Sequence, residues 1–266
     1  MGEFVIKLLL YADDLVLVAK SAHGLQMHLY ALEHFCRAVG MQVNISKTKI
    51  MIFSNKRNQS QHTFFLEGKI LEEVNEYEYL GIDFNKKINW EDYIKKRILG
   101  GWKALYALQN RCRELELWDW TTIKVLFGLL VCLVMLYGCE LCASNTPVSK
   151  WKQIEKIQKC LIMSKFKIKS LVPYEIMLSE IGAAPIEAIA MVHLIRYLKR
   201  IEQMEGGRWL KVIFNEGVNE RKKSWMRQNK KWMQKWNIYV NACPTNNKEL
   251  NNFVLDNFRK GIWGIK

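Results

Sequence analysis

Proline, low-complexity tracts and membrane-length apolar runs are all scarce in this sequence. Only four prolines occur in 266 residues, which argues against a linker-rich or fibrous protein. The longest uncharged apolar run is Val125–Cys139, flanked by Lys124 and Glu140. It is shorter than the roughly 20 residues that a membrane helix needs, so we expect a buried core helix and no membrane-spanning segment. No basic region or cleavage site of a secretory signal is visible near Met1.

Seven cysteines are present, an odd number, and most of them fall inside apolar helical patterns. This pattern favours reduced, buried thiols in an intracellular protein, either nuclear or cytoplasmic, over a disulfide framework. Cys139 and Cys142 form a Cys-x-x-Cys pair, but no second pair stands at a zinc-ligand spacing. We therefore expect both thiols to be core residues rather than zinc ligands.

The charge of the chain is strongly positive and unevenly distributed. Half of the residues are apolar, enough to build a core in one large domain or two small ones. Forty basic and 26 acidic side chains give a net charge of +14. Residues 1–90 hold 10 basic and 10 acidic side chains, so the whole excess lies in residues 91–266. Such an excess predicts a polyanionic partner, either nucleic acid or an anionic membrane surface.

The first 84 residues contain short apolar runs typical of strands, with one helix among them. Phe4–Leu10 and Leu15–Ala19 predict a β-hairpin around a polar tip. Ser21 can cap a helix that ends at Gly40. The apolar residues of that helix recur at helical spacing: Leu25, Leu29, Leu32, Phe35 and Val39. Further strands are expected over Thr48–Ser54, over Thr63–Leu66 and Lys69–Val74 as a hairpin about Glu67-Gly68, and over Tyr77–Phe84.

After Asn85 the pattern changes to helices. They are expected over Trp90–Arg113, from Asp119 or Thr121 to about Ala143, from Pro147 to about Phe166, over Pro173–Ile181 and from Pro185 to about Met204. In the third, Thr146 is the expected cap and Pro147 the first helical residue. The change coincides with the change in charge, so we place a domain boundary near residue 90. The predicted fold class is α+β, a short antiparallel sheet with one helix followed by an all-α region.

Two adjacent aspartates, Asp13 and Asp14, lie between the first two predicted strands. Like charges side by side are costly, and a divalent cation offsets that cost. Hard carboxylate oxygens suit Mg²⁺, which is commonly held by one or two carboxylates and substrate phosphates. A solvated β-turn is the alternative, because aspartate is common in turns.

The order of motifs around this pair is specific. An apolar strand, Tyr11-Ala12-Asp13-Asp14, a second apolar strand and a helix are followed by Asn44-x-x-Lys47-Thr48 and then Tyr79-Leu80-Gly81. This order resembles the second half of the palm of non-LTR (LINE-type) retrotransposon reverse transcriptases. Tyr137–Glu140, and Leu178–Gly182 with Pro185, resemble the helical region that follows the polymerase core. The resemblance covers roughly residues 4–205.

The resemblance implies a role for several of these residues. In that family two metal ions clamp the attacking 3′-hydroxyl and the leaving pyrophosphate. Asp13 would be the Mg²⁺ ligand and Asp14 a supporting carboxylate, since successive strand residues point to opposite faces. Tyr11 and Ala12 would line the floor near the primer end. The partners would be an RNA template, a DNA primer and a dNTP.

Two further residues carry alternatives. By resemblance, Lys47 would face the incoming triphosphate as a charge partner or proton donor; the alternative is an ordinary solvated lysine. Gly81 would allow close backbone approach to the primer strand, and the alternative is a bulge glycine.

The family's catalytic site also needs an aspartate on a strand upstream of this hairpin, which the sequence does not show. One carboxylate hairpin cannot hold two Mg²⁺ ions over a triphosphate. We therefore expect the chain to be inactive alone, as a fragment that lacks an N-terminal half. A non-catalytic nucleic-acid-binding remnant, or a decayed sequence without a selected function, is the alternative.

By the same resemblance, residues 1–90 would be a partial palm, residues 91–145 thumb-like helices, and residues 146–266 a basic helical C-terminal region. A thumb grips the template–primer duplex, and its expected contacts are Lys95, Lys96, Arg97 and Lys103.

The segment from Arg221 to Lys235 carries seven basic side chains and no acid, interleaved with tryptophans. Its candidate nucleic-acid contacts are Trp225, Lys230, Lys231 and Trp232, because lysines neutralise phosphates and indoles stack on bases. Two alternatives remain: a buried tryptophan stripe with a solvated basic face, and an amphipathic helix on a membrane surface.

Overall fold

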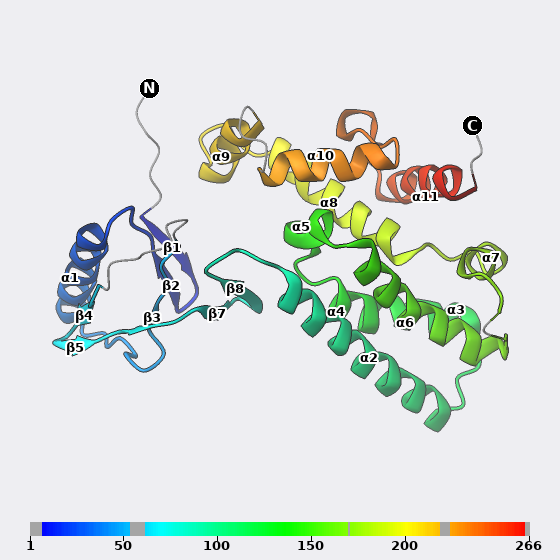
Figure 1. The fold of residues 1–266 in the computed structure, drawn as a ribbon, viewed down its shortest axis with the longest axis horizontal. Coiled ribbons are helices and arrows are strands. Elements are labelled where there is room, and N and C mark those ends of the chain that lie inside the picture. The colour runs from blue at the N-terminus through cyan, green and yellow to red at the C-terminus, as the bar shows by residue number, and fades with distance from the viewer. Residues whose placement is uncertain (1–6, 54–61, 170, 219–223, 264–266) are drawn as a thin grey trace. The chain divides into compact units, whose positions relative to one another are not determined.

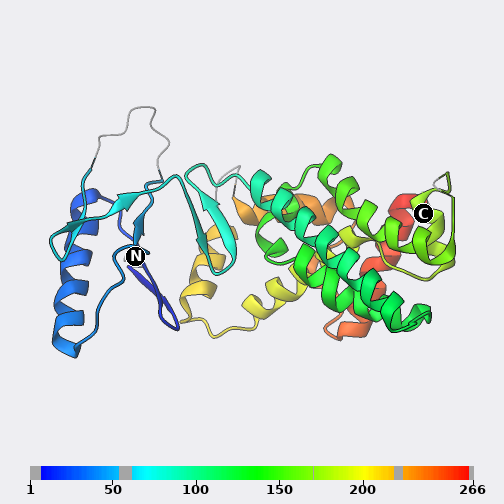
Figure 2. The same ribbon diagram turned by 90° about the horizontal axis from the view of Figure 1, so that it is seen from below.

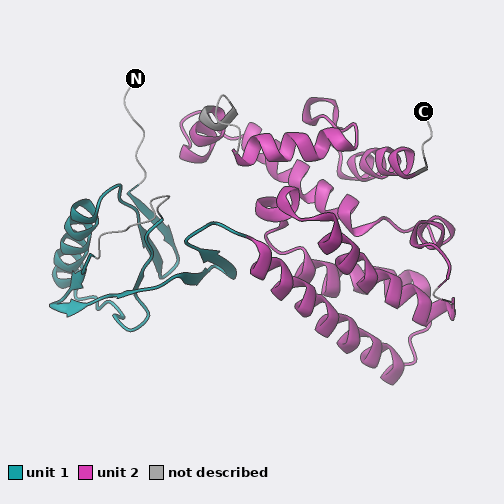
Figure 3. Cartoon of the chain, viewed as in Figure 1, with its two compact units in different colours: residues 1–89 teal, residues 90–266 magenta. Residues whose placement is uncertain are grey.

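The computed structural model describes residues 7–53, 62–169, 171–218 and 224–263. The chain divides into two compact units, residues 1–89 and residues 90–266 (Figure 3). The first unit combines short strands with one helix, and the second is helical (Figure 1). The predicted α+β class is confirmed.

The described residues of unit 1 form four two-stranded ladders and helix α1 (Ala22–Val39). Three ladders are antiparallel hairpins and one, β3 with β6, is parallel. The strands are β1 (Leu8–Tyr11), β2 (Asp14–Leu17), β3 (Lys49–Ile50), β4 (Phe65–Leu66), β5 (Lys69–Ile70), β6 (Glu72–Glu73), β7 (Glu76–Tyr79) and β8 (Ile82–Asn85).

Helix α1 begins and ends where the sequence predicts. The Ser21 side chain accepts a hydrogen bond from the Gly24 amide, and Gly40 closes the helix at φ +71°. One face of α1 packs on β4 (Figure 2), in a core formed by Leu29, Ile50, Phe64, Leu66 and Leu71. The Gln26 amide both donates to and accepts from the backbone of Phe65, at 2.8 and 2.9 Å, which locks the helix to this strand.

The predicted strand over Tyr77–Phe84 is wrong, because this segment forms the hairpin β7–β8. Leu80 and Gly81 both adopt positive φ, +50° and +75°, and form its two-residue turn. Two consecutive positive φ angles fit the right-handed twist of a hairpin. The parts of the predicted strands that fall on residues 4–6 and Ser54 lie outside the described residues.

Unit 2 is built on three long helices that pack in succession, α2 on α6 and α6 on α8. Its helices are α2 (Glu91–Glu114), α3 (Trp120–Leu126), α4 (Leu133–Met135), α5 (Cys139–Cys142), α6 (Val148–Phe166), α7 (Tyr174–Glu180), α8 (Ile186–Glu202), α9 (Trp209–Val218), α10 (Trp225–Lys235) and α11 (Asn247–Trp263). Helix α8 is the most buried and also contacts α5, α9 and α11.

The predicted helix from Asp119 to about Ala143 is interrupted. Asp119 does cap α3, accepting from the Thr122 amide at 2.7 Å. A π-helical segment, Phe127–Cys132, then joins α3 to α4, and Gly138 at φ +66° separates α4 from α5. Pro147 occupies the N-cap of α6 rather than its first helical position, and the Thr146 hydroxyl donates to Cys142 instead of capping that helix.

The apolar run Val125–Cys139 is only half buried. Phe127, Val131 and Met135 lie in the core, whereas Leu129 and Leu133 are 57% and 53% exposed. The run therefore contributes to the core as expected, but through one face only, and its other face is exposed. No single helix among the described residues meets the length and apolarity needed to cross a bilayer; the two arms Trp120–Met135 and Cys139–Asn145 meet it only together, with a 55° bend between them.

Candidate functional site

The Tyr-Ala-Asp-Asp segment forms the tip of an antiparallel hairpin. Strands β1 and β2 pair from Leu8 with Leu17 to Tyr11 with Asp14. Only Ala12 and Asp13 remain for the turn, and Ala12 takes a positive φ of +52°. A non-glycine residue at positive φ is uncommon in proteins. The backbone therefore places two adjacent carboxylates at one sharp tip.

Both carboxylates are exposed, and neither has a hydrogen bond or ion pair within the described part of the chain. Asp13 is a turn residue and Asp14 is the first residue of β2. The two-face alternation expected for successive strand residues therefore does not apply between them. Among the described residues, no third potential metal ligand gathers with this pair.

Lys47 lies in the turn that precedes β3. The Asn44 side-chain oxygen accepts hydrogen bonds from the Lys47 amide at 3.2 Å and from the Ser46 hydroxyl at 2.7 Å. The Thr48 hydroxyl donates to the Asn44 carbonyl. The Asn-x-x-Lys-Thr motif thus folds on itself and leaves the lysine side chain exposed.

Gly81 is a turn glycine of β7–β8 and not a strand or bulge residue. Its positive φ gives a local reason for glycine at this position.

The predicted thumb contacts on α2 differ in their surroundings. Lys95 pairs with Asp92 at 2.9 Å and Glu91 at 3.3 Å, and the hydrogen bond with Asp92 raises the pKa of Lys95. The Arg97 guanidinium lies over the rings of Tyr93 and Tyr137, at 5.1 and 5.8 Å from their centroids.

Lys96 and Lys103 are exposed on the same helix. Lys103 has no ion pair within the described residues. It lies beside Trp102, whose ring stacks on that of Tyr106, an exposed residue, with 5.7 Å between centroids. This part of α2 therefore presents an unpaired cation next to an aromatic surface.

The tryptophans of α10 face the core of unit 2. The Trp232 ring stacks on Trp151, and its indole N–H donates to the Glu187 carboxylate at 2.9 Å. Trp225 donates to the Glu140 carbonyl and packs edge-on against Tyr197. Trp236, the residue that follows α10, stacks on Phe258 with 3.9 Å between ring centroids, and its indole N–H donates to the same Glu187 oxygen.

These contacts fit the tryptophan stripe that the sequence leaves open as an alternative, with Trp232 buried and Trp225 and Trp236 partly buried. Lys230 and Lys231 are exposed on the opposite side of α10. Residues 221–223 of the predicted basic segment lie outside the described residues.

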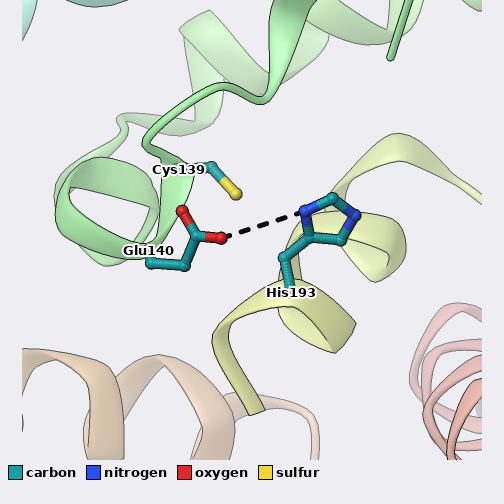
Figure 4. A group of neighbouring side chains, drawn as sticks. All are labelled: Cys139, Glu140 and His193. Atoms are coloured by element: carbon teal, nitrogen blue, oxygen red, sulfur yellow. Dashed lines mark ion pairs between the residues drawn. The ribbon is translucent and has the colours of Figure 1, made fainter. Parts of the chain in front are cut away.

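A second group of metal-ligating side chains was not expected from the sequence. Cys139, Glu140 and His193 each offer one donor atom, and these atoms all lie within 4.8 Å of one another (Figure 4). The two parts of the group are 53 residues apart, so only the packing of α5 on α8 shows it. Burial lowers the pKa of His193 and raises that of Cys139.

Comparisons with known proteins show what unit 1 is similar to. Residues 2–84, less than a third of the chain, match the family "Reverse transcriptase (RNA-dependent DNA polymerase)". The match contains the hairpin, Asn44-x-x-Lys47-Thr48 and Gly81. This segment of the chain is therefore reverse-transcriptase-like.

Two curated relatives connect the chain with transposons. An uncharacterized transposon-derived protein of Caenorhabditis elegans is 28% identical over 143 residues, covering 53% of this chain and 50% of the relative. A protein of Drosophila melanogaster named as an RNA-directed DNA polymerase from transposon BS is 28% identical over 141 residues, covering 49% of this chain and 15% of the relative. The chain thus spans half or less of the relatives it matches. No solved structure matches it.

Proposed function

We propose that the chain is part of the polymerase of a non-LTR retrotransposon. Unit 1 would be the second half of its palm, followed by thumb-like helices over residues 91–145 and a basic helical region over residues 146–266. The observation that carries this proposal is the hairpin tip, which presents two exposed carboxylates inside the segment that matches reverse transcriptases.

The donor chemistry of the tip fits magnesium. Asp13 and Asp14 offer only hard oxygens, which Mg²⁺ prefers. When bound, such an ion neutralises charge on the attacking and leaving oxygens of a phosphoryl displacement. Tyr11 and Ala12 would lie under the primer end, and Lys47, on a turn fixed by Asn44, would attract the triphosphate.

Two carboxylates on one hairpin are too few for a two-metal site. No third ligand approaches them in the part of the chain that the structure describes. We therefore propose that the catalytic site takes a further aspartate from another strand, and that the 266-residue chain alone does not extend primers.

The experiment is extension of a DNA primer on an RNA template by the purified chain, with Mg²⁺ and dNTPs. We expect no extension above background. Robust extension that is lost in Asp13→Asn and kept in Asp256→Asn, an exposed aspartate of α11, would contradict the need for a further ligand.

A non-catalytic nucleic-acid-binding protein is the second candidate, favoured by the +14 charge of residues 91–266. Both candidates bind an RNA–DNA hybrid through unit 2, with Lys103 and the aromatic pair beside it as contacts. They differ at the hairpin. Only the polymerase candidate requires that residues 2–84 support catalysis when the rest of an active palm is supplied.

A further inference from the structure

The group Cys139, Glu140 and His193 combines three different donors on two elements of unit 2. The Cys139 thiol and the Glu140 carboxylate come from the first residues of α5, and the His193 imidazole comes from α8 (Figure 4). The Glu140 Oε1 and His193 Nδ1 atoms are 4.0 Å apart.

The local backbone explains why these side chains converge. Gly138 adopts φ +66°, which interrupts the helical path after α4, and α5 begins directly at Cys139. The short helix packs against α8. Both sides are held by Trp225, whose indole N–H donates to the Glu140 carbonyl and whose ring packs on Tyr197, one turn after His193.

We propose that Cys139, Glu140 and His193 form a binding site for a divalent ion of the zinc class. Sulfur, imidazole nitrogen and carboxylate oxygen are the ligands of protein zinc sites, whereas Mg²⁺ takes oxygen ligands. Three protein ligands leave the fourth tetrahedral position open to water or to a further ligand. The ion would tie α5 to α8.

The geometry requires only a small contraction. Tetrahedral zinc with ordinary bond lengths draws its ligand atoms to about 3.4–3.6 Å from one another, and the three donors here already lie within 4.8 Å. The Glu140 and His193 side chains are 28% and 27% exposed, so both can turn toward an ion, and the ion can reach them.

Cys142 provides a matched control for substitution of Cys139. It lies on the same short helix and is equally buried, but its thiol donates to the Gly138 carbonyl at 3.7 Å and it is not a member of the group. A serine at position 142 therefore removes a neighbouring thiol without removing a proposed ligand.

The experiment is titration of the full chain, reduced and stripped of metal, with Co²⁺ under anaerobic conditions, followed by competition with Zn²⁺. We expect a sulfur-to-cobalt charge-transfer band that saturates at one equivalent and disappears when Zn²⁺ is added. Cys139→Ser should abolish the band. His193→Gln and Glu140→Gln should weaken Co²⁺ binding by about tenfold or more, and Cys142→Ser by less than about twofold.

The variants also separate this site from other thiol chemistry. If circular dichroism shows that Cys139→Ser unfolds, the Co²⁺ affinity of His193→Gln tests the site instead, because the partly exposed His193 side chain can be changed without opening the core. The absence of a band in the wild-type chain would overturn the proposal. So would a band that survives both Cys139→Ser and His193→Gln, or one lost in Cys142→Ser but unchanged in Glu140→Gln.

Discussion

Tyr11 and Asp14 form the last residue pair of the β1–β2 ladder, across a turn of only two residues. This pairing places Asp13 in the turn and Asp14 at the start of a strand, so both carboxylates share one tip. The same hairpin lies within the segment that matches reverse transcriptases. The pairing thus connects the local geometry of the chain with its proposed chemistry.

Lys103 and Lys95 provide a matched pair on α2 for testing nucleic-acid binding. Lys103→Ala should weaken binding to an RNA–DNA hybrid. The negative slope of log affinity against log salt should become shallower by about one. Lys95→Ala should change the slope less, because Glu91 and Asp92 already compensate that charge. Fluorescence anisotropy at several salt concentrations measures both slopes. Equal effects of the two substitutions would remove the reason for assigning the contact to Lys103.

Trp232 stabilises unit 2 through the buried Glu187 carboxylate. Trp232→Phe should lower the free energy of unfolding by about 1–3 kcal/mol, because the carboxylate loses a donor and the stack on Trp151 shrinks. All ten tryptophans lie in residues 90–266, so urea denaturation followed by their fluorescence reports on unit 2. Trp209→Phe, at a 47% exposed position, should change stability by less than about 0.5 kcal/mol. Similar losses in both variants would contradict a specific role for Trp232.

Glu155 should make unit 2 less stable as the pH rises. Burial, followed by the charges of Glu187 and Glu175, raises the pKa of Glu155 from 4.5 to about 7. Between these values the folded state binds more protons than the unfolded state, so stability falls from about pH 4.5 to about pH 7 and then levels off. Glu155→Gln removes this pH dependence. Its free energy of unfolding, compared with that of the wild type, should therefore rise by roughly 1–3 kcal/mol from pH 5 to pH 8. Urea denaturation at both pH values tests this, and a constant difference between the two proteins would contradict it.

Gly101 allows α2 to approach Met135 and Ile157 closely. A Cβ atom at this position would lie 2.5 Å from the Met135 Cγ and 3.0 Å from the Ile157 Cδ1. Gly101→Ala should therefore cost about 1–3 kcal/mol of stability. At Gly128 an added Cβ meets no atom within 4 Å, so Gly128→Ala should be neutral or stabilising by up to about 1 kcal/mol. The opposite order of the two variants in urea denaturation would contradict this packing.

Local signals predict much of the fold. Ser21, Gly40 and Asp119 act at the helix ends where the sequence places them, because capping depends on a few neighbouring residues. The β7–β8 turn escaped prediction because it needs Leu80 at positive φ, which leucine rarely adopts.

Tertiary packing decided what the sequence could not. Phe35 and Val39 fit the periodicity of α1 but are 56% and 51% exposed, while Cys36 between them is buried. Periodicity shows that a helix has an apolar face. It does not show how much of that face the neighbouring elements cover. The hairpin could be found because its residues are contiguous. The group of Cys139, Glu140 and His193 could not, because its parts lie on different helices.

The most direct test of the central claim is a chimeric polymerase. Residues 2–84 replace the corresponding segment of an active transposon reverse transcriptase, and primer extension on an RNA template is measured. We predict extension that Asp13→Asn reduces to background and that Asp83→Asn, the same substitution on the β7–β8 hairpin, leaves largely intact. A chimera that binds the RNA–DNA hybrid like its parent but does not extend the primer would contradict the account, as would extension that is indifferent to Asp13.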